Sequence, residues 1–385
     1  EAGFTVTGLD IDADKLTALR AGRSYIEDVQ EARLRPLVGR RLFASASFDE
    51  VLAAADVAII CVPTPLNQSR DPDLRALTAA SAAIARALHP GMLVSLESTT
   101  YPGTTDELLR PALEAGGLRA GRDFFLVFSP ERIDPGRKDF VVETTPKIVG
   151  GVTPTCREVG LACYRQAIHR VIGVGSSQAA ELAKLHENTF RAVNIALVNE
   201  LALMCDKLGI DVWEVIDAAS TKPYGFMRFT PGPGVGGHCI AVDPWFIAAS
   251  APDDTPLIQA ARRVNDGRPE RIIAQVRALA ARLRRPKVAC LGLTYKPDID
   301  DLRESPSLHI AQALAAEPEQ ELLLVEPHLH TSPIPGVPLV PLAHALASAD
   351  IIVVLVAHRQ FRHLRPDHLL RLMVVDAVGL LNPRT

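Results

Sequence analysis

A single thiol follows a stretch that is dense in glycine. Residues 231–239 read Pro-Gly-Pro-Gly-Val-Gly-Gly-His-Cys, and a carboxylate, Asp243, comes four residues after Cys239. Small residues let the backbone and a ligand approach closely, and a thiol with a carboxylate within one turn suits covalent catalysis. The alternative is an inert core cysteine, because free cysteines are among the most buried residue types. Taken alone, this segment leaves both interpretations open.

Residues 177–208 show apolar side chains at helical spacing and predict one long helix. Lys184 and Asn188 are four residues apart within it and therefore share a face. By itself such a pair is usually part of a solvated stripe. A helix of this length could also join two domains and offer a surface for a dimer.

Polar clusters follow the predicted strands of the first half of the chain. Pro63-Thr64-Pro65 follows the apolar run 57–62, Glu97 to Thr100 follows 93–96, and residues 128–132 form a third such site. Helices are predicted over 48–55 and 74–88. Strands that are apolar on both faces and separated by helices indicate a parallel sheet covered on both sides. Ligands bind at the carboxyl ends of such strands, so we expect cofactor contacts there.

The first residues predict the end of a helix, then a glycine, and then a strand that ends at Asp10. In a dinucleotide-binding βαβ unit, an acid at this place hydrogen-bonds the adenosine ribose about twenty residues after a glycine fingerprint. No such fingerprint precedes Asp10, so the first strand of the sheet and its phosphate turn are expected to be missing. The other interpretation is that Asp10 caps a helix that starts near Asp12 or Ala13.

A second α/β pattern begins after residue 286, with strands predicted at 287–293, 321–325, 351–356 and 373–375 and a helix from about 307. The loop after its first strand carries Lys296 and Arg303, which suits a phosphorylated ligand. An exposed charged loop is the alternative. We expect domains at 1–175, 176–280 and 281–385: an α/β domain, a helical middle domain with the long helix and the cysteine loop, and a second α/β domain.

Composition limits the classes of protein. A length of 385 residues predicts more than one core, and 48% hydrophobic with 22% charged residues is ordinary for a globular protein. A net charge of −4 gives no excess of positive charge for binding nucleic acid. No apolar stretch reaches the length of about 20 residues that a membrane helix needs. The six cysteines show no CxxC pair and no zinc spacing with histidine, so we expect free thiols, no metal and a cytoplasmic protein.

Several motifs together resemble one family, the nucleotide-sugar 6-dehydrogenases of the UDP-glucose/GDP-mannose dehydrogenase type. They occur in family order over nearly the whole chain. The matching segments are 62–65, 97–99, 129–132, 181–191, 234–244, 292–296 and 303–305. The fold that the resemblance implies is two Rossmann-like parallel-sheet domains joined by a long central helix and a helical middle domain, in a homodimer.

The resemblance implies a four-electron oxidation of the sugar's primary alcohol to a carboxylate by two NAD+ in turn. The residue types fit this chemistry. A thiolate can trap the intermediate aldehyde as a thiohemiacetal, and the thioester formed next needs a base and an oxyanion stabiliser for its hydrolysis. By similarity, Cys239 is the nucleophile, Lys184 and Asn188 stabilise oxyanions, and Asp243 orients or activates water. Glu131 would be a base, and Thr99 would position the water.

The resemblance also implies binding residues. Those for NAD are Asp10, Lys15, Pro63, Thr64, Thr99 and Arg303. Those for the UDP-sugar are Glu131, Arg132, Lys184, Asn188, Arg191, Phe229, Gly234, Gly236, Gly237 and Lys296. Lys296 and Arg303 would bridge the two sites. Without a phosphate turn before Asp10, the sequence as printed is expected to bind NAD+ poorly.

Different segments of the chain resemble two different branches of the family. Segments 24–26, 65–67, 97–105 and 222–226 resemble UDP-N-acetylglucosamine 6-dehydrogenases, whereas 234–246 and 300–306 resemble UDP-N-acetyl-D-mannosamine dehydrogenases. We favour the mannosamine substrate because that likeness surrounds the nucleophile. UDP-glucose fits less well, because His238 stands where its dehydrogenases usually have Ser. A module that only binds a nucleotide-sugar would leave Cys239 unexplained, and a two-electron hydroxy-acid dehydrogenase would not need it.

Overall fold

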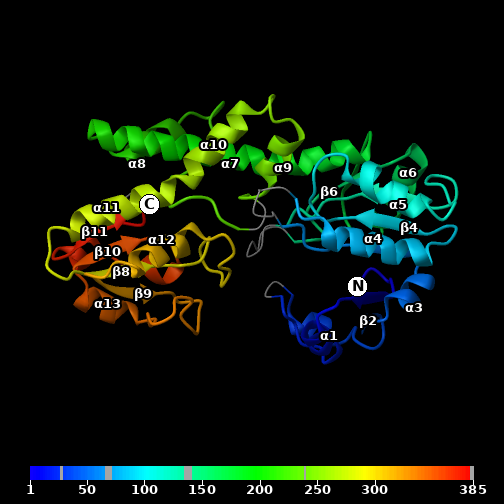
Figure 1. Ribbon diagram of the computed structural model, residues 1–385, viewed down its shortest axis with the longest axis horizontal. Coiled ribbons are helices and arrows are strands. Elements are labelled where there is room, and N and C mark those ends of the chain that lie inside the picture. The colour runs from blue at the N-terminus through cyan, green and yellow to red at the C-terminus, as the bar shows by residue number, and fades with distance from the viewer. Residues whose placement is uncertain (27–28, 66–71, 134–140, 238–239, 382–385) are drawn as a thin grey trace. The chain divides into compact units, whose positions relative to one another are not determined.

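The computed structural model describes residues 1–385 except 27–28, 66–71, 134–140, 238–239 and 382–385. Its backbone divides into two compact units. Unit 1 comprises Glu1–His186 with Trp245–Ser250, and unit 2 comprises Glu187–Pro244 with Ala251–Thr385. Figure 1 shows the elements along the chain.

Unit 1 contains two sheets. Strands β1 (Val6–Leu9) and β2 (Leu42–Ser45) form a parallel pair. The second sheet has the order β3-β4-β5-β6-β7, and its strands are β3 (Val57–Ile60), β4 (Leu93–Leu96), β5 (Phe125–Phe128), β6 (Lys147–Gly151) and β7 (Val171–Val174). All of its pairings are parallel except β5 with β6, which is antiparallel.

Helices connect these strands and cover the second sheet. They are α1 (Ala13–Arg20), α2 (Glu31–Leu34), α3 (Phe48–Ala53), α4 (Arg75–Ala87), the π-helical segment η1 (Thr105–Leu109), α5 (Arg110–Glu114) and α6 (Pro154–Tyr164). Two of them begin with side-chain caps: Asp12 accepts from the amides of Asp14 and Lys15, and Thr153 accepts from that of Cys156. The core of unit 1 is an apolar cluster centred on β4, β5 and β6.

Unit 2 begins within the long helix α7 (Ser177–Leu208), which starts in unit 1. The other helices before its sheet are α8 (Val212–Ser220), α10 (Pro256–Asp266) and α11 (Arg268–Ala280), while α9 (Asp243–Ser250) runs from unit 2 into unit 1. Pro256 and Pro269 stand in the first turns of α10 and α11, where a missing N–H costs no helical hydrogen bond.

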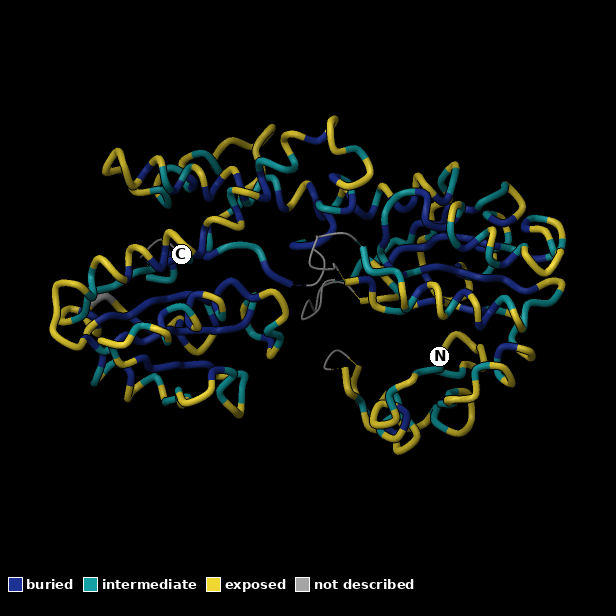
Figure 2. Tube along the Cα trace, in the orientation of Figure 1, coloured by how far each residue is buried: buried dark blue, intermediate teal, exposed yellow. Residues whose placement is uncertain are grey.

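The sheet of unit 2 is all parallel, in the order β11-β10-β8-β9. Its elements are β8 (Lys287–Leu291), α12 (Pro306–Ala315), β9 (Glu321–Val325), α13 (Leu342–Ser348), β10 (Ile351–Val354), η2 (Arg359–Phe361), η3 (Pro366–Leu369) and β11 (Met373–Asp376). Alternate residues enter opposite cores: Cys290 packs on one face and Leu291 on the other. Both faces are therefore covered at β8, β9 and β10, which are mostly dark blue in Figure 2, whereas the residues of the edge strand β11 are half-buried.

The α/β class with parallel sheets is confirmed. The long helix predicted over 177–208 matches α7, and the strands expected at 93–96 and 321–325 match β4 and β9. The predicted run 57–62 is shorter in the structure, and Ile59 is half exposed, so β3 is not covered on both sides. The antiparallel β6 was not foreseen. Among the described residues, no helix is both long and apolar enough to cross a membrane.

Candidate active site

A buried amide and a buried carboxylate meet where α7 passes the start of α9. Asn188 Nδ2 donates to Asp243 Oδ2 at 2.6 Å, and the two residues are 6% and 1% exposed. The acid stands in the first turn of its helix, where the helix dipole favours negative charge. The structure thus brings together two predicted catalytic residues that are 55 positions apart in the sequence.

Lys184 lies one turn before Asn188 on α7, so both point along one side of the helix. It is 6% exposed, which is rare for a lysine on a solvated stripe. The solvated-stripe interpretation of this pair is therefore wrong for these two residues. Arg191, predicted to bind substrate, is exposed on the same helix.

The glycine run packs against the loop that follows β8. The Gly237 amide donates to the Arg303 carbonyl at 3.1 Å. A side chain at Gly236 would place its Cβ 2.5 Å from the Glu304 carbonyl oxygen, and one at Gly237 would strike the Tyr295 ring at 2.8 Å. Gly237 also has a φ of +81°, a backbone region that residues with side chains rarely adopt. Both glycines are therefore required by the close approach of two segments.

The predicted nucleophile Cys239 and its neighbour His238 lie outside the described residues. The chain on either side of them is described. The glycine run ends at Gly237 before them, and the buried Asp243 follows them by four residues.

A buried pair of asparagines, which the sequence analysis missed, holds the start of the glycine run. Asn199 of α7 accepts from the Gly232 amide at 3.0 Å and donates to Asn265 Oδ1 of α10 at 3.0 Å. Asn265 in turn donates to the Ala192 carbonyl at 2.9 Å. The asparagines are 0% and 1% exposed. In the sequence, each asparagine could have been recognised as a polar residue at a helix position where the periodic pattern calls for an apolar one.

A second buried group, Arg268, completes this support. Its Nε donates to the Gly232 carbonyl at 3.0 Å. Both backbone polar groups of Gly232 are therefore hydrogen-bonded, the carbonyl to Arg268 and the amide to Asn199. Burial lowers the pKa of the Arg268 guanidinium below its usual value. Phe229, a predicted substrate residue just before the run, lies edge-to-face with Phe190 of α7 at a centroid distance of 6.0 Å.

In unit 1, the predicted cofactor residues follow the carboxyl ends of strands, except Lys15, which lies in α1. Asp10 follows β1, its Oδ1 accepts from the Asp12 amide at 2.9 Å, and its Oδ2 lies 3.7 Å from Lys15 Nζ. Its carboxylate is 35% exposed, so it can still accept a hydrogen bond from a ribose hydroxyl. The interpretation of Asp10 as the cap is wrong, because Asp12 caps α1. The residues at this end of β1 therefore fit the adenosine side of NAD.

The ends of β3 and β4 are joined by another predicted pair. Thr64 Oγ1 donates to the Thr99 carbonyl at 2.5 Å, and Thr64 is 4% exposed. Pro63 beside it is exposed. Beyond β5, Glu131 is exposed and its carboxylate accepts from the Ile133 amide, while Arg132 donates to the Pro146 carbonyl at 2.5 Å.

A polar network behind the end of β4 was also missed. Glu97 accepts from the Tyr164 hydroxyl at 2.5 Å and forms an ion pair of 3.0 Å with Lys147. Burial, followed by the charge of Glu97, raises the pKa of Tyr164 well above its usual value. A neutral tyrosine donor thus fixes the carboxylate that precedes Ser98 and Thr99. Lys147 also donates to the Pro130 carbonyl at 3.3 Å, which links this network to the Glu131 segment.

The first turns of α7 are tied to unit 1 by a buried carboxylate. Glu181 accepts from the amides of Gly103 at 2.6 Å and Thr105 at 3.0 Å, and from the Thr105 hydroxyl at 2.6 Å. These donors lie at the start of η1, where backbone N–H groups have no partner within the helix. Burial raises the pKa of Glu181 above its usual value. Glu181 therefore fixes the part of α7 that carries Lys184.

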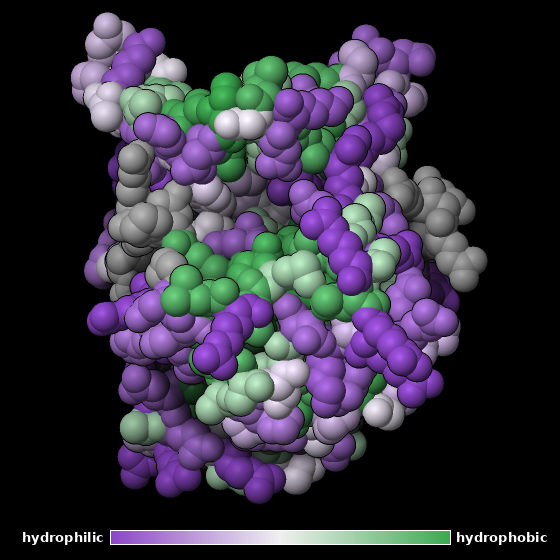
Figure 3. All heavy atoms as spheres, turned by 90° about the vertical axis from the view of Figure 1, so that its left-hand side faces the viewer, coloured by the Kyte–Doolittle hydropathy of each residue, from purple (hydrophilic) through white to green (hydrophobic). Residues whose placement is uncertain are grey.

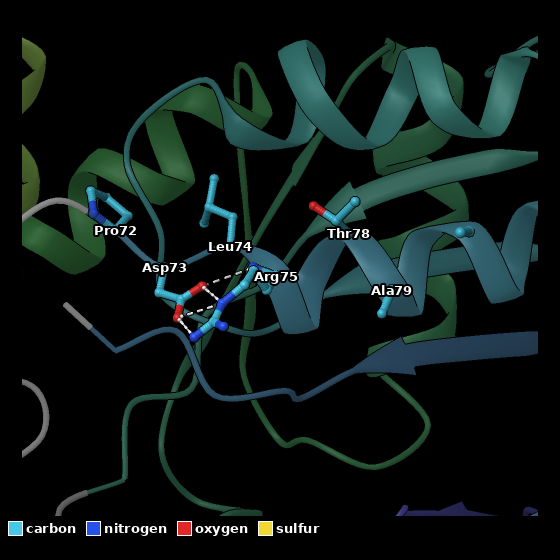
Figure 4. A pocket seen from close by; sticks show the side chains of 7 residues that line it. Pro72, Asp73, Leu74, Arg75, Thr78 and Ala79 are labelled. Atoms are coloured by element: carbon cyan, nitrogen blue, oxygen red, sulfur yellow. Dashed lines mark hydrogen bonds and ion pairs between the residues drawn. The ribbon is translucent and has the colours of Figure 1, made fainter. Parts of the chain in front are cut away.

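A shallow cavity of about 740 Å³ lies at the start of α4 (Figure 4). Its lining is mostly aliphatic. Asp73 and Arg75 face one another in it, with Arg75 Nη2 2.6 Å from Asp73 Oδ2. Because the Arg75 guanidinium is paired with the Asp73 carboxylate, the cavity does not offer a cluster of positively charged or N–H groups that could bind a phosphate. Its lining residues are Pro72, Asp73, Leu74, Arg75, Thr78, Ala79 and Ala82, none of them a predicted site residue.

The loop after β8 carries the last two predicted residues. Arg303 is exposed and forms an ion pair of 2.6 Å with Asp301. Lys296 is half-buried, and its carbonyl accepts from the Thr294 hydroxyl at 3.0 Å. This loop and the glycine run are therefore neighbours, as the Gly237 hydrogen bond shows.

Comparison with known proteins identifies the family of the chain. Family models match three consecutive parts of the chain: the UDP-glucose/GDP-mannose dehydrogenase NAD binding domain over 1–168, the central domain over 178–267 and the UDP binding domain over 289–383. The chain is 40% identical to an NDP-N-acetyl-D-galactosaminuronic acid dehydrogenase of Ralstonia nicotianae, over 97% of this chain and 90% of the relative. It is 39% identical to the UDP-N-acetyl-D-mannosamine dehydrogenase of Salmonella typhi, over 97% and 93%.

Solved structures give the same result. The UDP-D-ManNAc dehydrogenase of Pyrococcus horikoshii superposes with a TM-score of 0.90 at 32% identity, covering 99% of this chain and 91% of the other. The UDP-N-acetyl-mannosamine dehydrogenase Cap5O of Staphylococcus aureus does so with a TM-score of 0.87 at 35% identity, over 99% and 91%. The chain therefore belongs to the UDP-glucose/GDP-mannose dehydrogenase family and is an NAD-dependent nucleotide-sugar dehydrogenase.

Proposed function

We propose that this enzyme oxidises the primary alcohol of a UDP-N-acetylhexosamine to the carboxylate, with UDP-N-acetyl-D-mannosamine as the preferred substrate. The observation that carries the proposal is the buried Asn188–Asp243 pair. Asp243 lies four residues beyond Cys239, and Lys184 lies one turn before Asn188 on α7. A nucleotide-binding module without chemistry would have no use for such a pair, because burying a charge is costly.

NAD+, when bound, would accept the two electrons of each oxidation, so that one sugar yields two NADH. The protein's own residues carry the other steps. The Cys239 thiolate adds to the aldehyde carbon and the carbonyl oxygen takes a proton, which gives a thiohemiacetal. Its oxidation gives a thioester. Water then adds to the thioester, the C–S bond breaks, and the thiol and the carboxylate are released.

Asn188 is suited to stabilise negative charge in the additions. A primary amide has two N–H donors, and one of them is directed at Asp243. The hydrogen bond fixes the amide so that its second N–H has a set direction toward a developing oxyanion. Lys184 adds a positive charge from a site that is largely removed from solvent. Asp243, whose carboxylate is held by the Asn188 amide, would orient the attacking water, and Glu131 would serve as a base.

The three parts of the chain would divide the work. Residues 1–175 would bind NAD through Asp10, Lys15, Thr64 and Thr99, residues 176–280 would supply the catalytic groups, and residues 281–385 would bind UDP with Lys296. The family models over 1–168, 178–267 and 289–383 support this division.

The choice of sugar is supported by relatives rather than by a described contact. Relatives named UDP-N-acetyl-D-mannosamine dehydrogenase and relatives named NDP-N-acetyl-D-galactosaminuronic acid dehydrogenase are both found, at 38–39% and 38–40% identity respectively. These sugars share the N-acetyl group and differ in configuration at ring carbons. Discrimination between them therefore rests on a few contacts to hydroxyl and acetamido groups.

The test is NADH release from UDP-N-acetyl-D-mannosamine, its glucosamine and galactosamine counterparts and UDP-glucose, each with the Cys239→Ala variant as control. Two NADH per sugar, highest kcat/KM with the mannosamine substrate and loss of turnover in the variant are expected. A higher kcat/KM with another sugar would reassign the substrate. One NADH per sugar, or full turnover without the thiol, would contradict the mechanism.

We also propose that the enzyme is a homodimer. Three apolar residues of α7, Phe190, Leu197 and Met204, recur every seven positions and are 45%, 63% and 52% exposed. Such spacing forms one stripe along a helix, which a second copy can cover through a self-complementary contact. Apolar surface continues at Leu208 and Ile210, where α7 ends. On the face drawn in Figure 3, green spheres gather near the top of the view.

A further inference from the structure

The loop that joins β8 to α12 is held in an unfavourable backbone conformation. It carries Lys296 and Arg303, and two of its residues other than glycine, Asp298 and Glu304, have φ values of +62° and +50°. Residues with a side chain adopt this region rarely, and they persist there only where the surroundings over-determine them. Something in the structure must therefore fix this loop.

His358, which follows β10, contributes to that fixation through the Asp298 backbone, while the Arg359 amide donates to the Asp298 side chain at 2.9 Å. His358 Nδ1 accepts a hydrogen bond from the Asp298 amide at 3.0 Å, and its Nε2 lies 3.1 Å from Glu326 Oε2. Because Nδ1 accepts, the ring proton of neutral His358 must be on Nε2 and is donated to the carboxylate. The side chains of His358 and Glu326 are both fully buried.

Glu326, which follows β9, is itself held by backbone amides. It accepts from Leu293 at 2.7 Å and from His328 at 3.0 Å. Burial alone would raise the pKa of Glu326, but these hydrogen bonds and the one from His358 outweigh it and lower the pKa below its usual value. The carboxylate is thus a fixed, charged acceptor that sets the orientation of the imidazole.

Two further contacts extend the support to the functional residues of the loop. The Thr294 hydroxyl, 3.4 Å from His358 Nε2, donates to the Lys296 carbonyl. At the far end of the loop, the Arg303 carbonyl accepts from the Gly237 amide. A loop fixed by His358 therefore sets the position of Lys296 and forms one wall of the glycine run.

Asp298, His328 and His358 also approach one another as metal ligands do, with donor atoms within 4.8 Å. A metal needs a ring nitrogen with an available lone pair. In His358, Nδ1 already accepts from the Asp298 amide and Nε2 carries the proton that faces Glu326. The geometry therefore favours a structural link over a metal centre.

We propose that His358 is a positioning residue: its Nδ1 holds the Asp298 amide and so presents Lys296 and Arg303 to the diphosphate of the nucleotide-sugar. This inference rests on the proposed UDP-sugar function. His358 touches neither the sugar nor the reacting atoms, so it should act on nucleotide affinity and leave the chemical step nearly unchanged.

A matched pair of variants separates the two ring nitrogens. In His358→Asn the side-chain oxygen can replace Nδ1 as acceptor for the Asp298 amide, whereas in His358→Gln the amide group can replace Nε2 as donor to Glu326. Both variants remove the ring and so carry a similar packing cost. UDP affinity is measured by calorimetry on the whole chain, together with KM, kcat and the thermal midpoint.

His358→Gln is expected to weaken UDP binding and raise KM for the UDP-sugar about tenfold, the effect of losing one buried hydrogen bond, with kcat within about twofold. His358→Asn should bind UDP within about twofold of the wild type. Equal losses in the two variants, or a loss in kcat alone, would overturn the proposal. If the wild type binds no UDP, the proposed function fails and the inference fails with it.

Thr294→Val is a second variant that keeps the side-chain volume and removes the hydroxyl that donates to the Lys296 carbonyl and lies 3.4 Å from His358 Nε2. It is expected to weaken UDP binding severalfold and to lower the thermal midpoint by only about a few degrees, the effect of losing one buried hydrogen bond. If the His358 variants do not fold, unchanged UDP affinity in Thr294→Val overturns the proposal by itself.

Discussion

The side-chain amide of Asn188 donates to the carboxylate of Asp243 at 2.6 Å, although both residues are almost fully buried. A buried carboxylate needs hydrogen-bond donors to remain ionised, and a buried amide needs partners for its N–H groups. Each residue thus fixes the other, and the pair forms one rigid unit between α7 and α9.

Replacing Asn188 by alanine should therefore lower kcat by about 100-fold, the usual cost of losing one oxyanion donor. Asp243 also loses the hydrogen bond from Asn188. The measurement is NADH release under saturating substrate. Asn194→Ala is the matched control, because Asn194 lies on the same helix and its amide donates only to the Phe190 carbonyl one turn earlier among the described contacts. Equal kcat losses in the two variants would assign the effect to the helix and not to the site.

Gly236→Ala should destabilise the protein and raise KM for the UDP-sugar. The new Cβ would lie 2.5 Å from a backbone oxygen, so the glycine run and the loop after β8 must move apart. Overpacking of this kind costs about 1–3 kcal/mol in the free energy of unfolding, measurable by urea titration. Gly232→Ala is the control, because its Cβ meets no atom within 4 Å. A similar loss in the control would contradict this explanation.

Removing the buried amide of Asn199 should lower the free energy of unfolding by about 2–4 kcal/mol. Asn199→Ala leaves the Gly232 amide and Asn265 Oδ1 without their partner and opens a small cavity. Because Asn265 belongs to the same network, the double variant should cost less than the sum of the single variants. Strict additivity in this double-mutant cycle would show that the two asparagines act independently.

Glu326 should make stability depend on pH in the acid range. Its pKa is lower in the folded protein than in the unfolded chain, so the folded state binds the proton less tightly. The stability that it contributes is therefore full above the unfolded pKa of about 4.3 and is lost as pH falls through the lower folded pKa. In Glu326→Gln this titration is absent. The difference in free energy of unfolding between wild type and variant should shrink between about pH 6 and pH 3; a constant difference would argue against it.

Leu197→Lys should convert the proposed dimer into a monomer. The substitution places a charge in the middle of the exposed stripe on α7, where a second copy would have to bury it. Sedimentation equilibrium measures the mass in solution. Leu257→Lys is the control, since Leu257 is also exposed, at 68%, but lies on α10 outside the stripe. A monomeric wild type would refute the dimer itself.

The sequence alone determined the class of fold and the long helix, and it predicted the residues that would carry the chemistry. Helix α7 was predictable over its full length because its signal is a local period of apolar residues, and β4 and β9 because they are short apolar runs between helices. The motif around Asp243 and the one around Asn188 were each visible as patterns of residue types. Such patterns say which residues are unusual for their position, because they depend only on neighbours in the chain.

Only the tertiary structure decided which of these residues meet. The partners of Asp243, Asn199 and Glu97 lie 55, 66 and 67 positions away in the sequence. A helical or strand period specifies the face on which a side chain lies but carries no information about the element that packs there. For the same reason the antiparallel pairing of β6 and the link from His358 to Asp298 were not predictable, since each arises where distant segments are brought together by the packing of whole elements.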